Sequence, residues 1–186
     1  MKIAIVGNSS SGKSTLAKTI ASVYRLTHID LDVVAWKKPE GCDESPIRNN
    51  ISDAMLAIKT LCVASPQRWV VEGCYGDLIS ELIQQNDDTL LVYANAPVKQ
   101  CTENALRRPW EPHKYASKAE QDKNLGMLVE WIEGYALREG PLSKAYHDAL
   151  FNQFTGKKIL LDGQQLSLTE SERIAMVSGG CSWLKA

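Results

Sequence analysis

The chain has 186 residues, of which 44% are hydrophobic and 23% charged; this composition predicts one soluble globular domain and excludes disorder of the whole chain. The formal net charge of -1 offers no overall attraction to nucleic acid or to an anionic membrane. No apolar run approaches the ~20 residues of a membrane span, and the apolar start is too short for a signal peptide. We therefore expect a cytoplasmic protein with neither nucleic acid nor membrane as its partner. The five cysteines show no metal-ligand spacing and predict reduced thiols, and the oligomeric state is left open.

The first predicted elements are a strand and a helix joined by a glycine-containing loop. Residues 2–6, "KIAIV", form an apolar run of the kind that is buried on both faces of a sheet. Residues 7–15, "GNSSSGKST", follow, and the apolar spacing of Leu16, Ile20 and their neighbours predicts a helix over residues 13–24. The order strand, loop, helix is the one that phosphate binding requires.

The loop itself carries the strongest chemical signal of the sequence. Gly7, Gly12, Lys13 and Ser14 stand in the spacing G-x-x-x-x-G-K-[ST] of a phosphate-binding loop. A flexible Ser/Gly turn is the alternative, but a bare turn needs neither the flanking strand nor the helix. We expect Lys13 to reach the β- and γ-phosphates of ATP and the Ser14 hydroxyl to ligate Mg²⁺. The predicted nucleotide-binding residues are Gly7, Asn8, Ser9, Ser10, Ser11, Gly12, Lys13, Ser14 and Thr15.

Two aspartates follow the second predicted strand, which ends near Ile29. Asp30 and Asp32 stand at i and i+2, so in extended backbone both carboxylates point the same way. One of them can hold Mg²⁺ through water while the other accepts the proton of an attacking hydroxyl. We place Asp30 with the metal, although the sequence leaves this division open. The alternative is that the aspartates only cap a helix or form a turn.

The region after the second strand, about residues 33–62, is the predicted acceptor-binding region. Pro46 stands where a helix begins, and apolar helical spacing continues to Cys62. Arg48 lies just inside this predicted helix, where a small-molecule kinase holds its acceptor. A surface arginine is the alternative.

The third predicted strand covers residues 68–73, "RWVVEG", and a helix and a fourth strand follow at about 77–85 and 89–96. Glu72 ends the third strand, and Gly73 allows a ligand to approach closely. An acid there can bind an acceptor hydroxyl or a metal-bound water. The alternative is a strand-terminal glutamate in solvent.

A basic segment of about residues 107–138 is predicted to be a lid. A helix stops before Pro109, no periodicity follows until the capping box of Ser117 and Glu120, and an apolar-faced helix comes next. Nearby cations in this segment include His113, Lys114, Lys118 and Lys123. Planar guanidinium groups can clamp a transferring phosphoryl group, so the catalytic candidates here are Arg107, Arg108 and Arg138. A solvated basic face is the alternative.

A further helix from Pro141 to about Phe154 and a fifth strand over residues 157–163 complete the pattern. Strands that alternate with helices predict an α/β fold with a five-stranded parallel sheet covered on both faces. Ligands of such folds bind beyond the carboxyl ends of the strands. The loop, the two aspartates and Glu72 all stand at such ends, so we expect them to meet in one cleft.

These segments also carry a family resemblance. The loop "GNSSSGKST", the "HIDLD" stretch, "WVVEGCYGDLI" and "RRPWEPHKY" are similar to P-loop kinases of the nucleoside monophosphate kinase and shikimate kinase group. The likeness is closest to bacterial adenylate kinase-like or DNA topology modulation kinase-like proteins, and it spans about residues 1–163. It implies a P-loop NTPase fold with an arginine-bearing helical lid insertion. The chain lacks the threonine-glycine-aspartate segment of adenylate kinases and the glycine run of shikimate kinases.

The sequence therefore predicts an ATP- and Mg²⁺-dependent phosphotransferase whose acceptor is a small metabolite, with nucleotides among the candidates. The alternative is a nucleotide-binding ATPase or switch that acts through a partner. Residues 89–94 carry no acid after their apolar run, which weakens the switch hypothesis. A nucleic-acid-binding protein would need a continuous basic stripe, and outside residues 107–123 the sequence has none.

Overall fold

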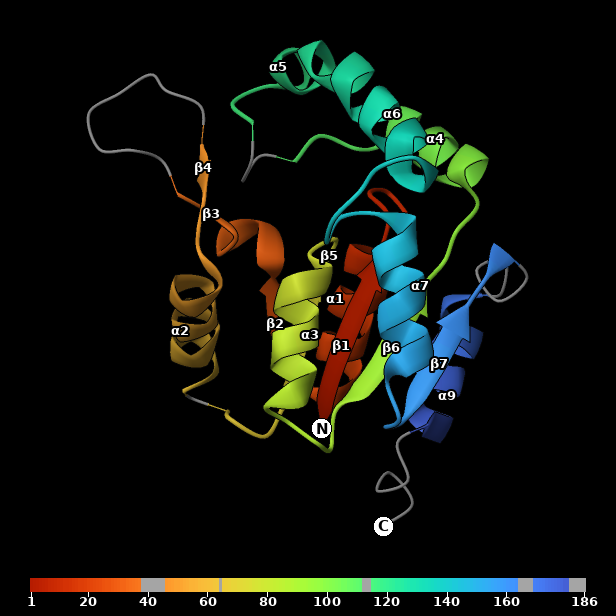
Figure 1. The fold of residues 1–186 in the computed structure, drawn as a ribbon. Helices are drawn as coiled ribbons and strands as arrows, with labels where there is room; N and C mark the ends of the chain where they lie inside the picture. Colours follow the sequence, from red (N-terminus) through yellow and green to blue (C-terminus); the bar gives the residue numbers. More distant parts are fainter. Residues whose placement is uncertain (38–45, 64, 112–114, 164–168, 181–186) are drawn as a thin grey trace.

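The computed structural model describes residues 1–37, 46–63, 65–111, 115–163 and 169–180. Five parallel strands form its main sheet, in the spatial order β2-β5-β1-β6-β7 (Figure 1). The predicted five-stranded parallel sheet is confirmed. The strands are β1 (Lys2–Gly7), β2 (Thr27–Asp30), β5 (Trp69–Gly73), β6 (Leu90–Ala94) and β7 (Lys158–Leu161).

The N-terminal strand β1 lies at the centre of this sheet. Ile5 pairs with Glu72 of β5 on one side, and Gly7 pairs with Ala94 of β6 on the other. β2 lies beyond β5, where Asp30 pairs with Glu72. The carboxyl ends of β1, β2 and β5 therefore meet at one edge of the sheet, as the parallel pattern predicts.

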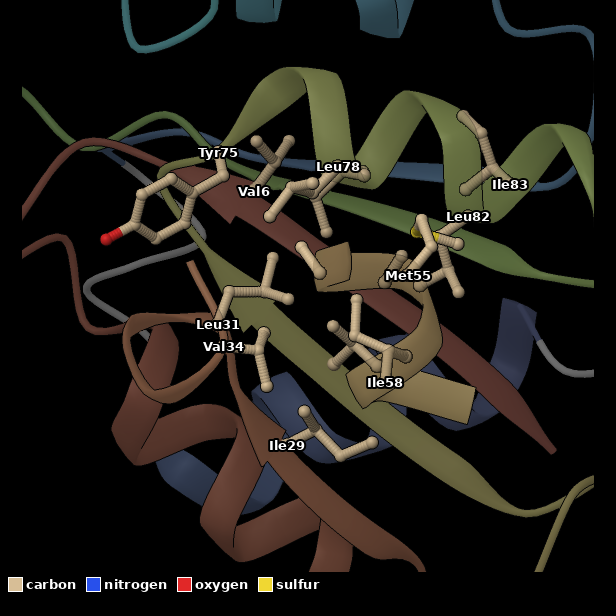
Figure 2. Packing of buried hydrophobic residues seen from close by; sticks show 14 of the residues in the cluster. Val6, Ile29, Leu31, Val34, Met55, Ile58, Tyr75, Leu78, Leu82 and Ile83 are labelled. Carbon is tan, nitrogen blue, oxygen red and sulfur yellow. The ribbon is translucent and has the colours of Figure 1, made fainter. Parts of the chain in front are cut away.

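Helices cover both faces of the sheet. Successive side chains of each strand point to opposite faces, so both faces present apolar side chains that helices bury. Ala4, Val6 and Val71 face the helices of one side, whereas Ile3 and Ile5 face those of the other. Figure 2 shows the first of these clusters, with Leu78 and Ile83 packed against Ile58 and Met55. Its helices are α2 (Ile51–Cys62), α3 (Gly76–Gln84) and α7 (Lys144–Gln153). The second cluster uses α1 (Lys13–Tyr24), α4 (Val98–Leu106), α6 (Leu125–Glu133) and α9 (Glu170–Gly180).

The helix after the second strand begins later than the sequence predicts. Ile47 and Arg48 form a short strand, β4 (Ile47–Arg48), that pairs antiparallel with β3 (Trp36–Lys37). The helix starts at Ile51 because the side chain of Asn50 caps it by accepting a hydrogen bond of 2.8 Å from the Asp53 amide. The prediction that Pro46 opens this helix is wrong, and Arg48 lies in a strand.

Between β6 and β7, the helices over residues 118–133 lie beyond the carboxyl ends of the strands (Figure 1). The predicted cap at Ser117 is confirmed: its side chain accepts from the Glu120 amide and begins α5 (Lys118–Lys123). The apolar-faced helix that follows is α6, and a 3-10 turn, η2 (Gly134–Ala136), extends it. α7 begins at Lys144, capped by Ser143, and not at Pro141 as predicted.

Within the described residues, no helix is both long enough and apolar enough to cross a membrane.

Candidate active site

The loop between β1 and α1 has the backbone geometry of an anion-binding site. Gly7 and Gly12 have φ of 157° and 90°, and Ser10, although it is not glycine, has φ of 58°. A Cβ at Gly7 would lie 2.4 Å from the carbonyl oxygen of Ala94, so only glycine fits between the two strands. This conformation turns the chain back at the N-terminus of α1, where free amides and the positive end of the helix dipole favour an anion.

Lys13 lies at the start of this helix with its side chain buried. Its ammonium donates a hydrogen bond of 2.7 Å to the carbonyl of Asn8 and lies 3.6 Å from Cys74 Sγ. Burial lowers the pKa of Lys13, but the thiol of Cys74 and the carboxylates of Glu72 and Asp32 outweigh this effect and raise it. The ammonium is therefore a fixed positive charge inside the loop.

Two asparagines tie the loop to the helices around it. The side chain of Asn8 accepts from the Ser9 amide at 2.8 Å and donates to the carbonyl of Ile132 at 3.1 Å. Asn104 on α4 donates to the carbonyl of Ser10 at 2.9 Å. The loop conformation is thus held from outside by α4 and α6.

The donor set of the loop fits a nucleotide triphosphate with Mg²⁺. The hydroxyls of Ser10 and Ser11 are buried and have no hydrogen-bond partner among the described residues, as donors held for phosphate oxygens would be. Ser14 is half-buried beside them. Hydroxyl and carboxylate oxygens are the ligands that Mg²⁺ prefers, together with phosphate oxygens.

Glu72 is buried, with 2% of its surface exposed, which rules out the alternative of a solvent-exposed strand end. Its Oε1 has no hydrogen-bond partner among the described residues, and Nε2 of His28 lies 3.7 Å from it. Burial raises the pKa of Glu72, but His28, Lys13 and the hydroxyl of Ser14 outweigh it, so this pKa lies below its usual value. A buried, ionised carboxylate thus stands beside the loop lysine.

Asp30 and Asp32 both reach the same cavity, and each also has a structural role. Asp30 Oδ1 accepts a hydrogen bond of 2.9 Å from the Asp32 amide and caps the 3-10 turn η1 (Leu31–Val33). Asp32 Oδ1 accepts a bond of 2.7 Å from the Tyr75 hydroxyl. Asp30 therefore forms a turn, as the alternative prediction holds, and it also lines the cavity.

A cavity of about 330 Å³ joins these groups. It is lined by the phosphate loop and the ends of β2 and β5, and also by Ala105, Arg108, Tyr115 and residues of α5 and α6. The predicted residues that it brings together are Ser9, Ser10, Lys13, Ser14, Asp30, Asp32, Glu72 and Arg108. A second hollow, of about 460 Å³, lies on the other side of the loop and is lined by Ser10, Ser11, Gly12, Lys13, Ser14, Thr15, Gln100, Asn104, Arg107, Arg108, Pro109 and Arg173.

Two predicted arginines do not line either cavity. Arg48 donates from Nη2 to both carboxylate oxygens of Asp77, at 2.7 and 2.9 Å, and lies over the ring of Tyr75. Arg138 lies 3.3 Å from the ring centroid of Trp131 and donates to the carbonyl of Leu142 at 2.9 Å. Arg108, in contrast, lines both cavities, with its Nε 3.2 Å from Glu111 Oε2.

Sequence analysis missed several residues around the loop. Cys74 and Tyr75 follow Glu72 directly, in the "EGCYG" stretch, and their place after a strand end was the available signal. Arg173 comes from α9, a helix that the sequence did not predict. The strand order also places an acid, Glu72, on β5 next to β1, whereas sequence analysis sought one at residues 89–94, in the strand on the other side.

The fold and the loop together define the class: the chain has the fold of P-loop small-molecule kinases. A gluconokinase from Sinorhizobium meliloti 1021 matches with a TM-score of 0.54 and 18% identity, over 98% of this chain and 92% of that one. A sugar kinase from Janibacter sp. HTCC2649 matches with a TM-score of 0.51 and 13% identity, over 99% and 94% of the chains. The Bacillus subtilis YorR protein, solved with phosphorylated GDP, matches with a TM-score of 0.53 and 10% identity, over 96% and 94%.

No known family profile matches the chain, and no curated protein sequence does. The likeness is therefore one of fold, at low sequence identity.

Proposed function

We propose that the chain is an ATP- and Mg²⁺-dependent phosphotransferase that moves the γ-phosphoryl group of ATP to a hydroxyl of a small molecule. The observation that carries the proposal is the cavity in which the buried Lys13 faces the carboxylates of Asp32 and Glu72. A phosphate-binding loop that opens into a carboxylate-lined cavity suits transfer to a second substrate. Structural neighbours that are called a gluconokinase and a sugar kinase support this class of reaction.

The residues of the loop bind and orient the donor. Loop amides and the ammonium of Lys13 hold the β- and γ-phosphates, so negative charge that develops on the equatorial oxygens meets a fixed cation. Ser14 is the proposed direct ligand of Mg²⁺, with Asp30 or Glu72 reached through water. Bound Mg²⁺ would neutralise negative charge on the phosphates.

The aspartates handle the acceptor. The carboxylate of Asp32 or Asp30 accepts the proton of the acceptor hydroxyl. At the same time, the oxygen of that hydroxyl forms a bond to the γ-phosphorus. The bond from that phosphorus to the β–γ bridging oxygen breaks, and ADP leaves with the electron pair. Asp30→Asn keeps the oxygen that caps η1, so a drop in turnover with unchanged thermal stability assigns Asp30 to the chemistry.

The segment of residues 107–138 acts as the lid in this proposal. Residues 33–62 were predicted from the sequence to bind the acceptor, but none of their described members lines the cavity. Part of each, residues 112–114 and 38–45, lies outside the described residues, as do His113 and Lys114. Arg107 and Arg108 supply guanidinium groups toward the donor phosphates. Closing such a segment over both substrates excludes water and prevents wasteful hydrolysis of ATP.

The second candidate function is an ATPase or switch, and the position of Glu72 favours it. Glu72 ends the strand next to β1, where P-loop ATPases and switches carry an acid for the metal. Release of ADP from Mg²⁺-ATP, measured with and without a panel of hydroxylated compounds, separates the two functions. Acceptor-stimulated turnover supports the kinase, and basal hydrolysis as fast as the best stimulated rate supports the ATPase.

A further inference from the structure

The charges that line the cavity of about 330 Å³ indicate the chemical class of the acceptor. Carboxylates of Asp30, Asp32 and Glu72 come from the strand ends, and the described residues that line the cavity include only two cations, Lys13 and Arg108. Asp122 also reaches the cavity, where it is ion-paired with Lys118. The described lining therefore offers more negative than positive charge to whatever occupies it.

Both cations of the lining are already engaged. Lys13 is held by the carbonyl of Asn8 and is the cation that the donor phosphates require. Arg108 is paired with Glu111 and lies at the border of the two cavities, next to the donor side of the loop. An acceptor with its own phosphate or carboxylate would meet no cation of the described lining dedicated to it.

Arg48, which the sequence placed at the acceptor, does not supply that cation. Its guanidinium holds both oxygens of Asp77 and stacks on Tyr75, and it does not line the cavity. Moving it to an acceptor would leave the carboxylate of Asp77 half-buried without its partner.

The remaining groups of the cavity suit a hydroxylated molecule with an apolar face. Leu125, Leu128 and Trp131 of α6 lie across from the carboxylates. The Oε1 of Glu72, buried and without a hydrogen-bond partner among the described residues, needs a donor. Hydroxyl and amino groups donate to carboxylates, whereas phosphate and carboxylate groups repel them.

We propose that the acceptor is a small hydroxylated molecule that carries no phosphate or carboxylate group, that is, a neutral or cationic polyol, sugar, nucleoside or amino alcohol. This inference rests on the proposed phosphotransfer, and it removes nucleotides from the acceptors that the sequence allows.

The test uses matched pairs of compounds that differ only in an anionic group. Suitable pairs are nucleosides with their 5′-monophosphates and sugars with the corresponding sugar acids. We expect the uncharged member to have the higher kcat/KM by at least about tenfold, since the carboxylates of the cavity repel a second anionic group. Binding of each compound is followed in parallel by calorimetry and by tryptophan fluorescence, to which Trp131 in the cavity contributes.

The possible outcomes separate the two proposals. Preferred turnover of anionic members overturns the inference and leaves the phosphotransferase intact. If no compound stimulates ADP release but uncharged members bind in the cavity, the phosphotransferase fails and the charge preference stands. If neither member of any pair binds, or anionic members bind more tightly, the inference is overturned.

A substitution tests the cause of the preference. Asp32→Asn removes one negative charge from the cavity and keeps an oxygen that can accept from Tyr75. The ratio of affinities between uncharged and anionic members should fall several-fold toward 1. Asp87→Asn, an exposed carboxylate remote from the cavity, is the matched control and should leave the ratio unchanged. A ratio that Asp32→Asn does not alter counts against the electrostatic origin.

Discussion

The hydroxyl of Tyr75 donates a hydrogen bond of 2.7 Å to the carboxylate of Asp32, and the same hydroxyl accepts one of 2.6 Å from the indole of Trp36. Burial and the neighbouring carboxylate raise the pKa of Tyr75 far above its usual value, so the hydroxyl stays protonated and keeps donating. Tyr75 thus fixes one oxygen of Asp32 beside the cavity.

Tyr75→Phe removes both hydrogen bonds and keeps the ring. We expect turnover to fall about tenfold while ATP affinity is unchanged, since a hydrogen bond to a charged group contributes about 1.5–3 kcal/mol. Steady-state kinetics with separate ATP titrations checks this. Tyr146→Phe on α7 is the control, and equal losses in the two variants would contradict a positioning role for Tyr75.

Lys13→Ala should reduce kcat/KM by about 10²–10³-fold, because the ammonium acts on developing charge. The free energy of unfolding should also fall, because Glu72 loses a buried cation beside it. Lys18→Ala is the control, since Lys18 is exposed on the same helix. Activity and chemical denaturation are measured on both variants. Full activity in a folded Lys13→Ala protein would remove the central claim.

The arginines of residues 107–138 should divide into two groups. Arg107→Ala and Arg108→Ala should impair transfer more than ATP binding, because Arg107 and Arg108 line the second hollow, of about 460 Å³, beside the phosphate loop. Arg138→Ala should instead lower the free energy of unfolding by about 1–3 kcal/mol, through loss of the Trp131 stack and the bond to Leu142. Thermal unfolding and single-turnover kinetics test this division, and a stable but inactive Arg138→Ala would restore the catalytic role that the sequence predicted.

Two glycines provide a matched pair. In Gly7→Ala the new Cβ meets the Ala94 carbonyl at 2.4 Å, so we expect loss of nucleotide binding and a destabilisation of several kcal/mol. Gly126 lies in α6 with open space at its Cβ, so Gly126→Ala should stabilise the protein by about 0.5–1 kcal/mol. Denaturant unfolding compares them, and a harmless Gly7→Ala would refute the close approach of β1 and β6.

Stability should fall at acid pH because of His147, which is fully buried. Burial lowers its pKa from 6.5 to about 4, with Nε2–H donating to the carbonyl of Cys74 at 2.9 Å and Nδ1 accepting from Tyr135. The unfolded state therefore binds more protons between these values. The full stability is present above pH ~6.5, and about 3 kcal/mol is lost as the pH falls to ~4.

The pH dependence of unfolding and an NMR titration of His147 measure this effect. His147→Gln removes the titrating group, so its free energy of unfolding should be lower at neutral pH and should change less between pH 6.5 and 4. An equal slope in both proteins would assign the acid sensitivity to other groups.

Much of the fold was predictable because its signals are local. The bounds of α1 agree with the predicted residues 13–24, since the apolar spacing and the glycine loop act within a few residues. The start of α2 was not predictable. Pro46 is a strong local signal for the start of a helix, but the pairing of β3 with β4 keeps the following residues in a strand. Helix α9 lacks a clear apolar repeat in sequence and owes its place to packing of Val177.

For the site, the sequence predicted the groups that stand at strand ends but not their partners. Asp77, which engages Arg48, is 29 residues away, so no local pattern connects them. The burial of Glu72 depends on β5 lying between β1 and β2, and strand order is a property of the assembled sheet. The roles of these residues in catalysis remain predictions.

The central position of β1 has a consequence for how the protein folds. Ile3 pairs with Val70 and with Leu90, so the middle strand finds both neighbours only in the second quarter of the chain. Closing such long loops costs entropy before any contact offsets it, and parallel sheets with distant pairings fold slowly. During synthesis the apolar run "KIAIV" emerges long before either neighbour, which exposes it to association with other chains. The strand that anchors the phosphate loop is thus also a segment that stays unpaired until much of the sheet has been synthesised.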